Sequence, residues 1–216
     1  MKREQAKACI EEIGIFPGIR VASADEALYS AETIFGAGIP IAEITMTVPG
    51  AIDVIRQLAE RFPNLVVGAG TVLDKETAER CIDAGARFIT STGLVPEVME
   101  AALKRGVLAI PGALTPTEVI AGWKAGADFV KIFPAAALGG DLYIRSLKLP
   151  LPQVRIIAAG GVNPQTAASF ILAGATAIGV GTELLPRDAV RKRQDHRIHE
   201  LARRFLGFVK EGRTVP

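Results

Sequence analysis

Cysteine is scarce in this chain of 216 residues, which contains only Cys9 and Cys81. Their spacing fits neither a disulfide framework nor a metal-binding motif, so the sequence predicts a reduced protein. Histidine is equally rare. The only two, His196 and His199, could share one face of a helix, but no supporting carboxylate motif accompanies them. We therefore expect no bound metal.

The chain also lacks long apolar runs and an excess of either charge. No stretch approaches the roughly 18 apolar residues of a membrane span, and the charged N-terminus is not followed by the apolar core of a signal peptide. With 25 basic and 23 acidic residues, the net charge is only +2. Nothing in this balance requires a nucleic acid or a membrane as partner. We expect a cytoplasmic protein that acts on small molecules.

A short motif recurs along the chain. Ala-Gly-Ala stands before an apolar run at 84–86, 125–127 and 173–175, and Ala-Gly-Ile at 37–39 is a near match. A glycine at such a place ends a helix in the left-handed conformation, so each copy predicts a helix, a stop and then a strand.

Strand and helix patterns alternate throughout. The predicted strands are 16–21, 41–43, 65–68, 87–90, 107–110, 129–131, 154–158 and 177–180. The predicted helices are 24–35, 51–61, 75–83, 96–104, 116–124 and 164–172, with Ser23 and Thr115 as caps and Pro116 and Pro164 near helix starts. We predict one α/β domain over 1–216, a (β/α)8 TIM barrel with an extra N-terminal helix over 1–13. An open doubly wound sheet is the alternative.

Lys131 is the most informative single residue. It lies within the apolar segment Asp-Phe-Val-Lys-Ile-Phe-Pro at 128–134, where an ammonium group would normally be excluded. Burial disfavours the protonated form of an amine, and a neutral amine can attack a carbonyl to form a Schiff base. The alternative is a strand-end lysine that extends its amine to solvent.

Other polar residues follow the ends of the predicted strands, where a barrel builds its active site. Glu43 and Thr45 end the second strand, and Thr71 follows the third. Glu43 could move protons for Lys131 or form only a structural salt bridge with it. Arg20 ends the first strand, and could bind a substrate carboxylate or make an ordinary ion pair.

Two glycine loops follow the last two strands. Gly160 and Gly161 lie in one, and Thr182 follows the glycines of the other. In a barrel these two loops often bind phosphate, although glycines also permit tight turns. The segment 187–213 reads as an amphipathic helix packed on the barrel, and Trp123 and Phe170 as packing residues.

Five segments occur in an order and at spacings that resemble the 2-keto-3-deoxy-6-phosphogluconate (KDPG) and 4-hydroxy-2-oxoglutarate (KHG) aldolases, which are class I enzymes. They are Glu-Ile-Thr-Met-Thr-Val-Pro at 43–49, Gly-Ala-Gly-Thr-Val-Leu at 68–73, Pro-Gly-Ala-Leu-Thr-Pro-Thr-Glu at 111–118, Lys-Ile-Phe-Pro at 131–134 and Gly-Gly-Val at 160–162. The resemblance spans nearly the whole chain.

This resemblance implies reversible cleavage of KDPG to pyruvate and glyceraldehyde 3-phosphate, and of KHG to pyruvate and glyoxylate. It implies that Lys131 forms the Schiff base without any other cofactor and that Glu43 moves protons. It places Arg20, Thr71 and Phe133 around the pyruvate unit, and Gly160, Gly161 and Thr182 around the phosphate. It implies a homotrimer whose other partners are a small keto acid and an aldehyde phosphate.

The chain departs from the family pattern at three places. Thr47 stands where some members have arginine, Ala158-Ala159 precedes the glycine pair where threonine is common, and Thr92 replaces a frequent proline. The alternatives are therefore an aldolase for the 6-phosphogalactonate epimer, a phosphate-binding barrel isomerase or synthase, and a non-catalytic binding barrel.

Overall fold

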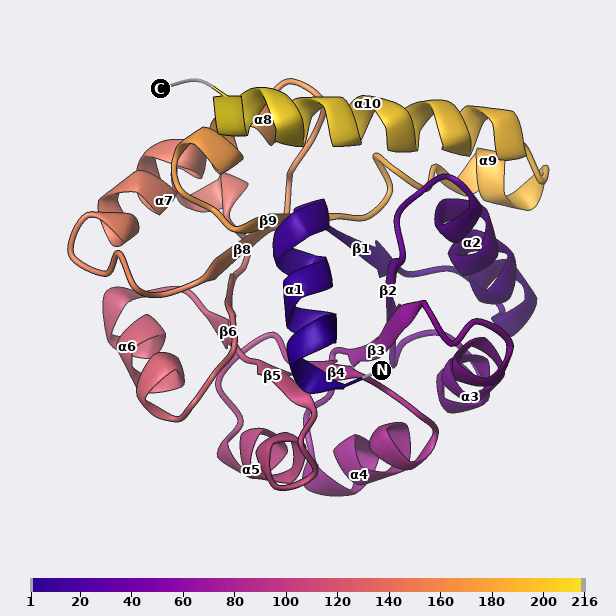
Figure 1. The fold of residues 1–216 in the computed structure, drawn as a ribbon, viewed down its shortest axis with the longest axis horizontal. Helices are drawn as coiled ribbons and strands as arrows, with labels where there is room; N and C mark the ends of the chain where they lie inside the picture. The colour runs from indigo at the N-terminus through magenta and orange to yellow at the C-terminus, as the bar shows by residue number, and fades with distance from the viewer. Residues whose placement is uncertain (1, 215–216) are drawn as a thin grey trace.

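The computed structural model describes residues 2–214, which form a ring of parallel strands surrounded by helices (Figure 1). The strands are β1 (Ile15–Ile19), β2 (Ile41–Thr45), β3 (Val66–Gly70), β4 (Phe88–Thr90), β5 (Leu108–Ile110), β6 (Gly112–Ala113), β7 (Val130–Ile132), β8 (Ile156–Ala159) and β9 (Ala177–Val180). Their order is β5-β4-β3-β2-β1-β9-β8-β7-β6.

The two ends of this order are neighbours in sequence, because only Pro111 separates β5 from β6. β5 pairs with β4 and β6 pairs with β7, so together they occupy the position of the fifth predicted strand. Pro111 has no N–H to donate, but its carbonyl accepts a 2.9 Å hydrogen bond from the backbone N–H of Lys131. The prediction of a barrel with an N-terminal helix is confirmed, and the open sheet is excluded.

The helices fill the intervals between strands. They are α1 (Arg3–Ile13), α2 (Ala24–Gly36), α3 (Ala51–Arg61), α4 (Lys75–Asp83), α5 (Pro96–Lys104), α6 (Pro116–Lys124), α7 (Gly140–Lys148), α8 (Ala167–Leu172), α9 (Arg187–Arg191) and α10 (Asp195–Thr214), with a 3-10 turn at Ala136–Leu138. The glycines of the repeated motif have φ angles of 91° to 102° at Gly38, Gly85, Gly126 and Gly174. The predicted left-handed helix ends are confirmed.

Three helix predictions were wrong or incomplete. α7 was missed, because it begins at Gly139-Gly140, a pair that is typical of a turn and has positive φ at both residues. α8 begins at Ala167 rather than Pro164, because the side chain of Asn163 accepts hydrogen bonds from the backbone N–H groups of the next turn. The segment 187–213 is not one helix, since the chain reverses between α9 and α10 at Arg193, whose φ is 51°.

α1 lies across the centre of the ring and closes one end of the barrel (Figure 1). Its residues Ala6 and Ile10 are buried in an inner core with side chains from the strands. Arg3 donates hydrogen bonds of 2.9 and 2.8 Å to the two oxygens of the buried Asp128, which stands just before β7. A second, larger core lies between the strands and the outer helices, where Phe170 is buried as predicted.

Trp123 does not belong to either core, because 42% of its surface is exposed on α6. Its predicted packing role was therefore wrong within the single chain. Both cysteines are free, Cys81 buried and Cys9 half-buried. None of the described helices is long and apolar enough to span a membrane.

Candidate active site

A pocket of about 430 Å³ lies at the carboxyl ends of the strands, opposite α1. Its wall is built mainly from β1, β2, β7, β8 and β9 and the loops that follow them. The lining contains eight of the nine predicted site residues: Arg20, Glu43, Thr45, Lys131, Phe133, Gly160, Gly161 and Thr182. Residues far apart in the sequence thus meet because parallel strands end at one mouth.

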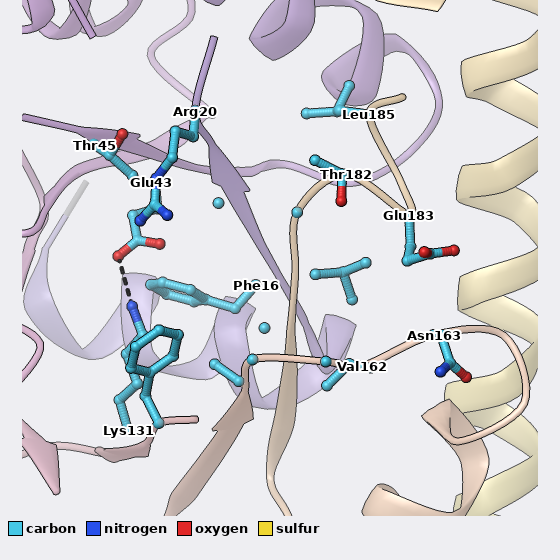
Figure 2. Close-up of a pocket in the computed structure, with 18 of the residues that line it drawn as sticks. Phe16, Arg20, Glu43, Thr45, Lys131, Val162, Asn163, Thr182, Glu183 and Leu185 are labelled. Atoms are coloured by element: carbon cyan, nitrogen blue, oxygen red, sulfur yellow. Dashed lines mark hydrogen bonds and ion pairs between the residues drawn. The ribbon is translucent and has the colours of Figure 1, made fainter. Parts of the chain in front are cut away.

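Lys131 is the central residue of β7, paired in register with Gly112 and Ile157 on the neighbouring strands. Its side chain is only 11% exposed, so it does not extend to solvent as the alternative interpretation required. The amine Nζ lies 3.2 Å from Oε1 of Glu43 (Figure 2) and 5.8 Å from the centre of the Phe133 ring. The amine therefore projects into the pocket beside one carboxylate and one aromatic face.

Glu43 is held in a close-fitting slot on β2. A Cβ atom at Gly70 would come within 2.5 Å of its Oε1, and one at Gly18 within 3.1 Å of its Oε2. Both neighbours must be glycine or nearly so for the carboxylate to fit. Oε1 also accepts a hydrogen bond from the hydroxyl of the fully buried Thr90, so it has two donors, Thr90 and Lys131.

Arg20 and Thr45 lie on the same side of the pocket as Glu43. Figure 2 shows the Arg20 side chain directed inward from the end of β1. Arg20 makes no ion pair with any residue in 2–214, so the structure gives no support to its interpretation as an ordinary ion-pair residue. The Thr45 hydroxyl donates a 3.1 Å hydrogen bond to the carbonyl of Ile19 and lies 2.8 Å from the hydroxyl of Thr47.

The far end of the pocket is formed by the loops after β8 and β9 (Figure 2). Gly160 and Gly161 have φ angles of 88° and 81°. A Cβ at Gly160 would lie 2.9 Å from the Cα of Pro134, and one at Gly161 only 2.5 Å from the Cβ of Ala136. The turn itself therefore requires both glycines, whatever they bind.

Thr71 is the predicted site residue that does not line this pocket. It follows β3 with a positive φ of 61°. Sequence reasoning also missed residues that do line it, namely Asn163, Glu183 and Arg187. All three lie within the loops after β8 and β9, so the glycine loops could have pointed to them. Among residues 2–214, no group of three potential ligands is arranged to hold a metal ion.

The model of the KDPG and KHG aldolase family matches residues 6–201. The chain belongs to this family. The KHG/KDPG aldolase of Escherichia coli (strain K12) is 34% identical over 197 residues, which are 91% of this chain and 92% of that protein. A 2-dehydro-3-deoxy-6-phosphogalactonate aldolase of the same strain is 32% identical over 205 residues, 94% of this chain and 95% of that one.

A solved structure of a family member is similar over most of its length. The KDPG aldolase of Legionella pneumophila, with pyruvate captured as a covalent carbinolamine intermediate, has a TM-score of 0.81 and 31% identity. The match covers 92% of this chain and 96% of that one. A KDPG aldolase of the same fold thus forms a covalent adduct with pyruvate.

Proposed function

We propose that this protein is a class I aldolase that reversibly cleaves KDPG into pyruvate and glyceraldehyde 3-phosphate. The observation that carries the proposal is the 3.2 Å approach of Lys131 Nζ to Glu43 Oε1, both side chains largely buried in a pocket at the strand ends. A buried pair alone is weak evidence of stabilisation. The same pair at the mouth of a barrel suits carbonyl chemistry, which needs an amine and a proton carrier.

In the cleavage direction, the neutral amine of Lys131 attacks the C2 carbonyl and forms a carbinolamine. Loss of water gives an iminium ion. Glu43 accepts the proton of the C4 hydroxyl, the C3–C4 bond breaks and its electron pair moves to the iminium carbon through C3. The aldehyde leaves and an enamine remains. Protonation at C3 and hydrolysis then release pyruvate and the free lysine.

The remaining lining residues divide between the two ends of the substrate. Arg20 and Thr45 lie beside Glu43, where they can hold the carboxylate of the keto acid, and the ring of Phe133 packs beside Lys131. Gly160, Gly161 and Thr182 lie at the far end, where backbone N–H groups and a hydroxyl can bind phosphate. We retain Thr71 as a residue of the pyruvate site only as a hypothesis, since it lies outside the pocket lining.

Reductive trapping tests this proposal. The protein is incubated with pyruvate and borohydride, and the intact protein and its peptides are examined by mass spectrometry. We expect a reduced pyruvyl adduct on the peptide containing Lys131, no adduct in Lys131→Ala, and no cleavage of KDPG by that variant. An intact, folded protein that forms no adduct would exclude the class I mechanism and favour a barrel isomerase, synthase or binding protein.

A second candidate substrate is the 6-phosphogalactonate epimer, which differs at C4. It is favoured by the similarity to a phosphogalactonate aldolase and by Ala158-Ala159, which lacks the hydroxyl common at this place in the family. KHG is a third candidate, since a relative carries both KHG and KDPG in its name. Rates with each purified keto acid distinguish the three, because the trapping experiment uses only their shared pyruvate unit.

We further propose a single domain over 1–216, a homotrimer, a cytoplasmic location and catalysis without a metal or organic cofactor. Exposed apolar surface supports self-association: Leu73 is 56% exposed, and a hollow near α5 is lined by Leu94, Met99 and Leu103. Light scattering tests the trimer, which predicts three times the 22.8 kDa of one chain. Full activity after dialysis against a chelator tests the absence of a metal.

A further inference from the structure

A second hollow of about 360 Å³ adjoins the active-site pocket. Arg20, Val21 and Arg187 line both, so the two spaces are continuous. Arg191 lines the second hollow from the same short helix, α9. We call this hollow the arginine annex, defined by Arg20, Arg187 and Arg191.

The arginines of the annex differ from those beside them. Arg193 forms an ion pair with Asp25, and Arg197 forms one of 2.6 Å with Asp188. Arg187 and Arg191, by contrast, make no ion pair or side-chain hydrogen bond within the described part of the chain. Two neutralised guanidinium groups thus face outward, whereas the two without a partner face the annex.

Acidic groups do not neutralise the annex from its own wall. Glu26 is the single carboxylate among its described lining residues, and its Oε2 accepts a 3.0 Å hydrogen bond from the backbone N–H of Ala22. That contact directs Glu26 toward the start of its own helix, α2. Three guanidinium groups against one occupied carboxylate leave a net positive hollow, which favours an anion.

The far end of the catalytic pocket lacks such a charge. Gly160, Gly161 and Thr182 offer only neutral donors, and the adjacent Glu183 adds a negative charge (Figure 2). A terminal phosphate carries a charge of about −1.5 to −2 near neutral pH and needs a cation nearby. Of the cations that line the pocket, Lys131 pairs with Glu43 and Arg20 lies beside that pair, so Arg187 is left for the phosphate.

We propose that Arg187, supported by Arg191, binds the terminal phosphate of the substrate in the annex and determines the preference for phosphorylated keto acids. The inference rests on the proposed aldolase function. It adds to the glycine loops a bidentate guanidinium donor, the group best suited to phosphate oxygens.

The test compares cleavage of KDPG with that of 2-keto-3-deoxygluconate, which lacks the phosphate. In Arg187→Gln we expect the ratio of the two kcat/KM values, phosphorylated over unphosphorylated, to fall about 10- to 100-fold. Most of the change should lie in KM for KDPG. Arg191→Gln should lower the ratio less. Inorganic phosphate should inhibit the wild type competitively, and Arg187→Gln more weakly.

Arg204→Gln is the matched control, because it removes the same charge from an exposed position on α10 away from both hollows. Its ratio should equal that of the wild type. An unchanged ratio in Arg187→Gln, or an equal loss with both substrates, would overturn the proposal. Failure of the aldolase function itself is recognised separately, since the wild type would then form no borohydride-trapped pyruvate adduct on Lys131.

Discussion

The carboxylate of Glu43 uses its two oxygens differently. Oε1 is occupied by Thr90 and Lys131, whereas Oε2 lies next to Gly18. Replacement by glutamine keeps the shape but cannot accept a proton. We expect Glu43→Gln to slow cleavage by roughly 10²- to 10⁴-fold, measured as kcat on KDPG. A nearly normal kcat would assign the proton transfer to another group.

Thr90 is a positioning residue, because it touches Glu43 and not the pocket. Thr90→Val removes the hydroxyl while keeping the shape, which leaves Oε1 with Lys131 as its one side-chain donor among the described residues. We expect kcat to fall about 10-fold and the acidic limb of its pH profile to move toward higher pH, as loss of a donor disfavours the carboxylate. Thr90→Ser should restore both. A loss of stability without movement of the pH profile would indicate a purely structural role.

At this scale the sequence revealed the two chemical groups but not their supports. Lys131 and Glu43 could be predicted because a charged residue inside an apolar strand is conspicuous in any sequence. Thr90 could not be assigned to Glu43, because 47 residues separate them and only the register of β2, β3 and β4 brings them together. The exclusion of Thr71 from the pocket lining likewise depends on its backbone conformation.

Among the helices, α6 has the best-defined start. Hydrogen bonds from the backbone N–H groups of Thr115 and Leu114, and from the Thr115 hydroxyl, hold the pKa of Glu118 below its usual range. The pKa is lower in the folded state, so this stabilisation is complete above the ordinary value of 4.5 and is lost as the pH falls through the folded-state value.

Glu118→Gln should therefore unfold at lower urea concentration than the wild type at pH 7, and the gap should narrow at pH 3. Urea titrations at the two pH values measure this. A gap that does not depend on pH would mean that the carboxylate charge contributes nothing. Thr115→Ala, which removes the cap hydroxyl, should cost about 1 kcal/mol at pH 7.

The attachment of α1 depends on Asp128. This buried carboxylate accepts two hydrogen bonds from Arg3 and a third, of 3.0 Å, from the backbone N–H of Ala109. Asp128→Ala leaves these donors without an acceptor and should lower the free energy of unfolding by about 3 kcal/mol, measured by urea denaturation.

Asp53→Ala is the control for this substitution, since Asp53 pairs with Arg56 on the exposed face of α3 and should cost less than about 1 kcal/mol. Equal losses in the two variants would show that α1 is not fixed through Asp128. Element boundaries were predicted best where a single residue dictates them, as at Ser23, Thr115 and Gly85. They failed at Asn163 and Gly139, whose turns depend on contacts that no local pattern reveals.

For the whole molecule, Cys81 reports on global opening. Burial raises the pKa of its thiol to about 12, and the sulfur lies 3.6 Å from that of Met46 beneath the outer helices. We expect a thiol reagent at pH 8 to modify Cys81 only when the barrel unfolds, so peptide mass spectrometry should show labelling that rises with urea. Rapid labelling in native buffer would mean that α4 opens by itself.

The alternation of strand and helix was enough to predict a barrel, but not the manner of its closure. Closure depends on the pairing of β6 with β7 beyond Pro111, a contact between neighbouring strands that each carry only two or three paired residues. Such short pairings leave no mark in hydrophobic periodicity, and neither does the surface that would meet another copy of the chain.

The position of Pro111 also divides the chemistry. Everything before it carries Glu43 and Thr90, and everything after it carries Lys131, so neither portion holds both the amine and its carboxylate. A chain severed near this point would yield two fragments, each mute in the assay. Any turnover by their mixture would then count reassembled molecules one by one, which makes the enzyme a natural split reporter of barrel complementation.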